Sequence, residues 1–162
     1  PTTGASYCQK VINIDKYNLK INFDIWDTAG QEKFRSLNKI FYKDADVALF
    51  IYDITRESSY KEIKTFWINE LSTYSNEDII KVLVGNKSDL YFDEKISEEE
   101  ARTMADERKC LFRYTSALNS SGIDELFETI GERFLETNDE NNEKSFKINR
   151  NDKKIQKSGC CN

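Results

Sequence analysis

The hydrophobic pattern of the chain begins with strict alternation. In residues 19–26 (LKINFDIW), every second residue from Leu19 to Ile25 is apolar, and polar residues occupy the positions between them. This period of two is typical of a strand with one buried face. The preceding segment 8–14 (CQKVINI) and the polar turn at 15–18 predict that the two segments pair as an antiparallel hairpin.

Further along, the pattern changes to nearly continuous apolar runs, which indicate parallel strands covered on both faces. These runs occupy residues 47–54, 79–86 and 110–117. A helical pattern follows each of them. The signals are Ile63, Phe66, Trp67 and Leu71, then the capping-box pair Ser97 and Glu100, then Ile123, Leu126, Phe127, Ile130 and Phe134. This order predicts a three-layer α/β fold with a mostly parallel sheet and one antiparallel hairpin.

Composition divides the chain near residue 137. From there to residue 162 the chain is dominated by Asn, Lys, Asp and Glu. Such a segment buries too little apolar area to offset the entropy lost on ordering, so we expect residues 137–162 to form a disordered tail. The length of 162 residues and the distribution of apolar runs predict one domain over residues 1–136.

The absence of histidine from the sequence excludes histidine catalysis and histidine metal sites. The four cysteines have neither a zinc spacing nor the pattern of a secreted disulfide framework, which favours a reduced, cytosolic chain. They are Cys8, Cys110, Cys160 and Cys161. No run of 18 apolar residues is present, so we expect no membrane-spanning segment.

The net charge of −5 is unevenly distributed. Residues 144–157 carry six Lys or Arg and one acidic residue, Asp152, so the rest of the chain is strongly acidic. An acidic body argues against nucleic acid as a partner. The basic segment indicates that the tail meets a negatively charged surface.

Three polar clusters follow predicted strands. They are DTAGQE at 27–32, NKSD at 86–89 and TSAL at 115–118. In open α/β sheets, ligands bind at the carboxyl ends of the strands. We therefore expect three separate strands to deliver small hydrogen-bonding residues to the same edge of the sheet.

The first cluster suits phosphate and metal chemistry. Asp27 can hold a magnesium ion through water, and Gly30 lets the backbone offer an N–H group to a phosphate. Gln31 is neutral and can orient a water molecule without reacting. Taken alone, the motif also fits an ordinary turn after a strand.

The other two clusters suit a purine pocket. Asp89 can accept two hydrogen bonds from adjacent N–H groups of guanine, whereas adenine would leave the carboxylate unpaired. The Lys87 stem can cover a face of the base, and Asn86 can connect neighbouring loops. TSAL would add the backbone N–H of Ala117 toward the base carbonyl. Each motif alone also fits a solvated strand end.

Together, these segments resemble the Rab family of Ras-superfamily small GTPases. WDTAGQEKFRSL, FYKDADVALFIYDIT, GNKSDL and TSAL are similar to its motifs, and the match covers residues 1–136. PTTGASY resembles the effector loop of the early-endosomal branch. The resemblance implies a Ras-like P-loop GTPase fold, GTP, GDP and Mg²⁺ as ligands, and hydrolysis of GTP to GDP in a switch that regulates vesicular traffic.

The resemblance also assigns roles to individual residues. Thr2 would coordinate magnesium and meet the γ-phosphate, while Ser116 and Leu118 would flank the base. Leu118 replaces the usual lysine of this motif, and Thr3 replaces the usual isoleucine of the effector loop. Effector proteins would read Trp26, Phe34 and Tyr42.

The family's phosphate loop, GxxxxGKS/T, occurs nowhere in the 162 residues. We therefore expect Pro1 to be a truncation point or the edge of a missing exon. The loop supplies the main phosphate cradle, a magnesium-binding hydroxyl and a lysine for the phosphates. We expect this chain alone to bind GTP and GDP weakly and to lack measurable GTPase activity.

The C-terminal sequence CCN resembles the Rab pattern too. Cys160 and Cys161 would carry geranylgeranyl groups, and the basic segment before them would favour an anionic leaflet. The resemblance then implies effector, exchange-factor, activating and prenyl-escort proteins as partners. It places the protein on the cytoplasmic face of intracellular membranes, such as the early endosome, and in the cytosol when it is GDP-bound and escorted.

Two alternatives stay open from the sequence. The chain could be a nucleotide-independent interaction module that is complete as given. It could also be a Ras-superfamily member outside membrane traffic, although CCN disfavours this because plasma-membrane Ras proteins end in a Caax box.

Overall fold

The computed structural model describes residues 6–28, 42–76 and 78–151, with side chains as far as residue 138. The strands are β1 (Ser6–Ile14), β2 (Leu19–Asp27), β3 (Val47–Asp53), β4 (Ile80–Asn86) and β5 (Leu111–Thr115). The helices are α2 (Glu57–Glu62), α3 (Ile68–Tyr74), α4 (Glu98–Glu107) and α5 (Ile123–Asn151). Each strand and helix predicted from the apolar pattern is present within a few residues of its expected place.

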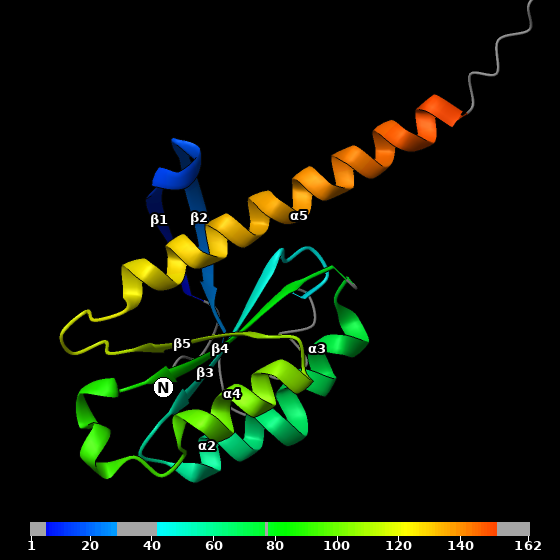
Figure 1. Cartoon of the computed structure of the whole chain (residues 1–162). Helices are drawn as coiled ribbons and strands as arrows, with labels where there is room; N and C mark the ends of the chain where they lie inside the picture. Colours follow the sequence, from blue (N-terminus) through cyan, green and yellow to red (C-terminus); the bar gives the residue numbers. More distant parts are fainter. Residues whose placement is uncertain (1–5, 29–41, 77, 152–162) are drawn as a thin grey trace, which may run out of the picture.

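The centre of the molecule is a parallel sheet in the order β3-β4-β5. Helices α2, α3 and α4 cover one face, and α5 covers the other (Figure 1). The apolar runs supply side chains to both faces: Leu83 packs in the cluster under α2–α4, while Val82 and Val84 pack with Leu126 and Ile130 of α5. The three-layer α/β fold with a parallel sheet is therefore confirmed.

The helices begin and join where the sequence dictates. The hydroxyl of Ser97 accepts a hydrogen bond from the backbone N–H of Glu100 at 3.2 Å, which confirms the predicted N-terminal cap of α4. Helices α2 and α3 are continuous through a π-helical turn at Ile63–Trp67. Ile63, Ile68 and Leu71 are buried on the side of this helix that faces the sheet.

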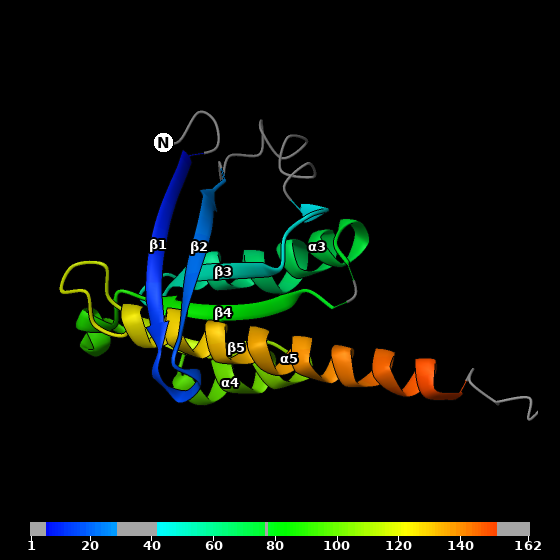
Figure 2. The ribbon, with the colours of Figure 1, turned by 90° about the horizontal axis from the view of Figure 1, so that it is seen from above.

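Strands β1 and β2 form the predicted antiparallel hairpin, with Ser6 opposite Asp27 and Ile14 opposite Leu19. Asn18 closes the turn in the left-handed conformation, with φ 51°. The hairpin differs from the prediction in one respect. In the described part of the chain it is a sheet of its own, and it crosses the parallel sheet rather than extending it (Figure 2).

The hairpin lies where it does because it packs on α5. Ile14 is fully buried, and a Cβ at Gly131 of α5 would lie only 2.5 Å from its Cδ1 atom, so a glycine is needed for this close approach. The rings of Phe23 and Phe127 pack edge to face at 5.2 Å. Two exposed ion pairs also connect the hairpin to α5. Nζ of Lys10 lies 2.8 Å from Oδ1 of Asp124, and Nζ of Lys16 lies 3.0 Å from Oε1 of Glu136.

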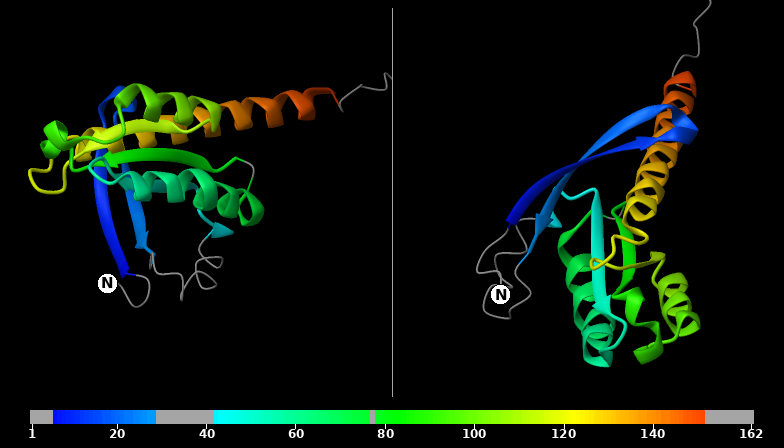
Figure 3. Two further views of the ribbon diagram at one scale, coloured as in Figure 1. Left: turned by 90° about the horizontal axis from the view of Figure 1, so that it is seen from below. Right: turned by 90° about the vertical axis from the view of Figure 1, so that its left-hand side faces the viewer.

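The C-terminal region differs from the prediction of a disordered tail from residue 137. Helix α5 continues to Asn151 and projects well past the sheet (Figure 3). Low apolar content predicts that a segment will not pack, but it does not prevent a helix. Glu and Lys are good helix formers, and no Gly or Pro interrupts residues 132–151. No helix in the described part of the chain has the length and apolar character needed to cross a membrane.

Candidate guanine-binding site

The three strands of the parallel sheet end in a row of polar residues. The strand register places Asp53 opposite Asn86, and Asn86 opposite Thr115. These residues are the last of β3, β4 and β5, so one edge of the sheet carries a carboxylate, an amide and a hydroxyl side by side. This is the edge at which ligands of open α/β sheets bind.

Asn86 connects all three strand ends. Its side-chain oxygen Oδ1 accepts hydrogen bonds from the backbone N–H of Ala117 at 3.2 Å and from the hydroxyl of Thr115 at 3.4 Å. Its backbone carbonyl accepts from the N–H of Ile54 at 3.1 Å. The amide therefore ties loops together as expected. The N–H of Ala117, expected to face a base carbonyl, donates to Asn86 in this structure.

Asp89 is oriented by a buried serine. The hydroxyl of Ser116 donates a short hydrogen bond to Oδ1 of Asp89, and the Ser116 side chain is completely inaccessible to solvent. The same hydroxyl oxygen accepts from the N–H groups of Leu118 at 3.3 Å and Asn119 at 3.4 Å. Among the described residues, none donates to the other carboxylate oxygen of Asp89, which stays available to a ligand.

The loop that carries Ser116 is closed by a glycine. Gly122 has φ 72°, and a Cβ there would lie 2.3 Å from the carbonyl oxygen of Tyr114. The turn allows the N–H of Ser116 to donate to the carbonyl of Ser121 at 2.9 Å. Only glycine fits this position without strain. Gly122 therefore helps to position Ser116 relative to Asp89.

Lys87 lies between Asn86 and Asp89 with its backbone in the left-handed region, at φ 67°. Its Nζ atom lies 2.6 Å from Oδ2 of Asp53. Burial opposes ionisation of Asp53, but hydrogen bonds from Lys87 and Thr55 outweigh it and lower the pKa of Asp53 to about 2. Sequence reasoning did not single out Asp53, because it stands at the end of an apolar run.

The sequence also did not single out the pair Tyr114 and Glu94, which lies next to the turn that carries Asp89. The hydroxyl of Tyr114 donates to Oε1 of Glu94 at 2.5 Å, and Glu94 follows directly on the 3-10 turn Ser88–Asp93. A Cβ at Gly85 would lie 2.5 Å from the Tyr114 ring, so the glycine before Asn86 makes room for this tyrosine. Burial raises the pKa of Tyr114, and the hydrogen bond to Glu94 raises it further.

The first polar cluster is not at this edge. Asp27 ends β2, in the hairpin, and the strand ends apart from the row formed by β3–β5 (Figure 2). The structure therefore brings together two of the three predicted clusters. The other expected site residues, Thr2, Gly30, Gln31, Cys160 and Cys161, lie outside the described residues. Within the described ranges, no group of three or more Cys, Asp and Glu residues is arranged to hold a metal ion.

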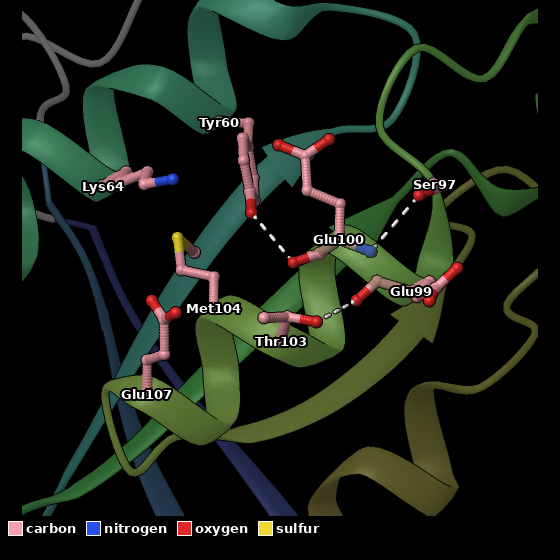
Figure 4. A pocket seen from close by; sticks show the side chains of 8 residues that line it. All are labelled: Tyr60, Lys64, Ser97, Glu99, Glu100, Thr103, Met104 and Glu107. Atoms are coloured by element: carbon pink, nitrogen blue, oxygen red, sulfur yellow. Dashed lines mark hydrogen bonds between the residues drawn. The ribbon is translucent and has the colours of Figure 1, made fainter.

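A separate cavity of about 360 Å³ lies between α2 and α4 (Figure 4). Its floor is formed by Tyr60 and Met104, and its rim carries carboxylates that include Glu100 and Glu107, with Lys64 opposite. The hydroxyl of Tyr60 donates to the backbone carbonyl of Glu100 at 3.2 Å. Because carboxylates repel phosphate groups, this cavity does not suit a nucleotide.

The fold and the strand-end network define a three-layer α/β protein with a hydrogen-bonded row of polar residues at the carboxyl ends of its parallel strands. The model of the Ras family matches residues 1–136. The chain is 38% identical to Ras-related protein Rab-2B of Dictyostelium discoideum, over 83% of this chain and 65% of that protein. It is 41% identical to Rab-11C of the same organism, over 80% and 56%.

Rab-22A of Canis lupus familiaris is 37% identical over 99% of this chain and 82% of that protein. The chain belongs to the Rab family of Ras-superfamily small GTPases. It spans somewhat less than two thirds of the length of the first two relatives. Membership of this family does not favour the alternative of a nucleotide-independent module.

Proposed function

We propose that the chain binds guanine nucleotides at the carboxyl ends of β4 and β5, as part of a GTP-hydrolysing switch in membrane traffic. The observation that carries the proposal is the hydrogen bond from buried Ser116 to Asp89. It fixes one carboxylate oxygen, and among the described residues none donates a hydrogen bond to the other. A carboxylate held in this way can accept both N–H groups on one edge of guanine, and adenine offers no such pair.

The neighbouring side chains complete a pocket of the right chemistry. Asn86 presents an amide beside Asp89, and the Lys87 stem offers an apolar surface for one face of the base. Leu118, whose side chain is 83% exposed, offers an apolar surface from the other loop. Stacking of a base between two such surfaces would remove exposed apolar area from water. The N–H of Ala117 would reach a base carbonyl by exchanging its bond to Asn86.

We assign the phosphate end of the site to the first cluster, although the described structure places Asp27 apart from the edge formed by β3–β5 (Figure 2). Asp27 is an exposed carboxylate at a strand end, which suits a magnesium ion held through water, with Thr2 as the second ligand. A bound magnesium ion would neutralise charge on the phosphates. Gly30 would donate its backbone N–H to a phosphate oxygen, and Gln31 would orient the attacking water.

Effector recognition fits the outer end of the hairpin. The rings of Tyr7 and Trp26 contact each other in a tilted arrangement, with 4.8 Å between their centroids, and each residue is about half exposed. Paired exposed aromatic side chains are typical of protein-binding surfaces. With Phe34 and Tyr42, they would form the surface read by effectors. Exchange factors, activating proteins and prenyl-escort proteins are further partners that the family implies.

Membrane attachment would depend on Cys160 and Cys161, because two lipid chains anchor stably while one binds only marginally. We assign the protein to the cytoplasmic face of intracellular membranes, with the early endosome as the organelle. Replacing both cysteines with serine should leave the protein cytosolic, and replacing one should leave it weakly held. Fractionation of cells that express each variant measures this, and a double variant still on membranes would show that lipid is not the anchor.

The base-binding proposal is tested by titrating the 162-residue chain with GDP or ADP at millimolar concentrations while ¹H–¹⁵N chemical shifts are recorded. We expect saturable changes at residues 86–89 and 116–118 with GDP, and weaker binding of ADP. Base contacts by themselves support an affinity of about millimolar. Equal responses to the two nucleotides, or changes confined to other regions, would contradict the proposal.

Hydrolysis needs a separate measurement, on a protein in which a GxxxxGKS/T phosphate loop precedes residue 1 of this chain. Gln31→Leu should slow single-turnover hydrolysis of GTP without abolishing nucleotide binding, because Gln31 is assigned only the orientation of water. An unchanged rate in this variant would remove Gln31 from the mechanism.

A further inference from the structure

We infer that Asp53 is a positioning residue that holds Lys87 in place to stack on the base. The inference rests on the proposed function, since it concerns the same pocket. It assigns a role to the end of β3, a strand from which no base-reading residue is expected.

Asp53 and Lys87 form an ion pair across the ends of two neighbouring strands. Asp53 stands directly opposite Asn86 in the register of β3 and β4, and Lys87 is the next residue along. The distance of 2.6 Å between Nζ of Lys87 and Oδ2 of Asp53 is that of a charge-assisted hydrogen bond. The lysine stem is therefore fixed at both ends, by its own backbone and by the end of the neighbouring strand.

The carboxylate of Asp53 is itself held in one orientation by further hydrogen bonds. Its other oxygen, Oδ1, accepts from the N–H of Thr55 at 2.9 Å and from the Thr55 hydroxyl at 2.7 Å. The backbone N–H of Asp53 donates to the hydroxyl of Ser59 in α2 at 3.1 Å. The carboxylate side chain is only 15% exposed. An ion pair with a partner this well fixed is more than a loose surface contact.

Lys87 adopts a backbone conformation that is unfavourable for lysine. Lysine rarely adopts a positive φ, because Cβ then crowds the backbone, so Lys87 needs a contact that favours φ 67°. A free lysine side chain also samples many rotamers, and a base that stacks on it must restrict them. The bond to Asp53 restricts them before the nucleotide arrives. Preorganisation of this kind strengthens binding without adding a contact to the ligand.

The test compares Asp53→Asn with the unmodified 162-residue chain by the GDP titration described above. Asparagine keeps the size and the hydrogen-bonding oxygen but loses the charge. We expect GDP binding to weaken by about three- to tenfold, the value of one immobilised side chain. Glu57→Gln removes the carboxylate of an exposed ion pair to Lys61 on α2 and serves as the matched control, with no change expected.

A second background separates positioning from general support of the fold. In Lys87→Met chains, Asp53→Asn should weaken GDP binding no further, because the lysine through which Asp53 acts is gone. An equal loss in both backgrounds, or no loss in either, would overturn the inference. Thr55→Val, which removes one hydrogen bond to Asp53, should give a smaller effect with the same dependence on Lys87. It replaces Asp53→Asn if that variant does not fold.

A measurement without nucleotide reports the ion pair directly. Acetylation by a small reagent, followed by mass spectrometry, should modify Lys87 several-fold faster in Asp53→Asn than in the unmodified chain, while the rate at Lys61 stays the same. Equal rates at Lys87 would overturn the inference. If the unmodified chain shows no preference for GDP over ADP, the proposed function fails, and the role of Asp53 toward a base fails with it. If it shows that preference and Asp53→Asn does not change the affinity, only this inference fails.

Discussion

The edge of the sheet where β3, β4 and β5 end and the β1–β2 hairpin are both expected to face a nucleotide, but they are held in different ways. At the sheet edge, Asn86, Asp89 and Ser116 hydrogen-bond to one another or to neighbouring backbone over buried strands. The hairpin is attached to α5 through Ile14, through the ring contact between Phe23 and Phe127, and through exposed ion pairs. The base-reading half of the site is therefore preorganised by the core, while the hairpin depends on a small set of contacts with one helix.

The comparison predicts that the two regions can be uncoupled. Ile14→Ala should lower the free energy of unfolding by about 2–4 kcal/mol, because Ile14 is fully buried where the hairpin packs on Gly131 of α5. Hydrogen exchange should accelerate in β1 and β2 more than in β3–β5. Val11→Ala is the matched control, since Val11 is mostly exposed, and it should cost under about 0.5 kcal/mol. Equal acceleration in both regions would show that they form one cooperative unit.

The sheet edge should be disrupted selectively by Ser116→Ala. This change removes the donor to Asp89 and the acceptor for Leu118 and Asn119 in a buried position. We expect a loss of about 1–3 kcal/mol in the free energy of unfolding, together with weaker GDP binding, while hydrogen exchange in the hairpin stays unchanged. Urea unfolding and the GDP titration measure the two effects, with exposed Ser121→Ala as the control. A variant with unchanged GDP affinity would show that Asp89 does not need Ser116.

How well the sequence predicts each region follows from the same difference. Alternation and continuous apolar runs predicted all five strands, because burial on one face or on both determines those patterns. Asn86, Asp89 and Ser116 stood out because each belongs to a short motif, NKSD or TSAL, at the end of an apolar run. Asp53 is a single polar residue between Tyr52 and Ile54, and Tyr114 is part of the run itself, so neither stood out. Their partners, Lys87 and Glu94, are distant in sequence or in a loop.

The separate position of the hairpin and the length of α5 could not be predicted from the hydrophobic pattern. Periodicity assigns a strand but not its neighbours, so the hairpin's separation from the parallel sheet required the contact between Ile14 and Gly131 to be known. Composition reports whether a segment can pack, so the continuation of α5 to Asn151 could not be predicted from a lack of apolar residues.

The smallest effect expected is a pH dependence of the free energy of unfolding that arises from Asp53 at the sheet edge. The pKa of Asp53 is lowered to about 2 in the folded state, from an ordinary value of 3.8. Its stabilising contribution is therefore fully present above about pH 4 and is lost as the pH falls toward 2. The difference in unfolding free energy between the unmodified chain and Asp53→Asn should shrink over that window. Chemical denaturation at pH 7, 4 and 3 measures it, and a difference that stays constant would contradict the assigned ion pair.

The most direct test of the account is whether Asp89 selects guanine. The 162-residue chain and its Asp89→Asn variant are titrated with GDP and with xanthosine diphosphate, and Asp93→Asn in the same turn serves as the control. Because an amide replaces one acceptor with a donor, the variant should lose affinity for GDP and gain affinity for xanthosine diphosphate, which carries a carbonyl where guanine carries an amino group. A reversed preference in Asp89→Asn and an unchanged one in Asp93→Asn are the predicted results. An Asp89→Asn chain that still prefers GDP to the same degree would contradict the assignment of this sheet edge as a guanine site.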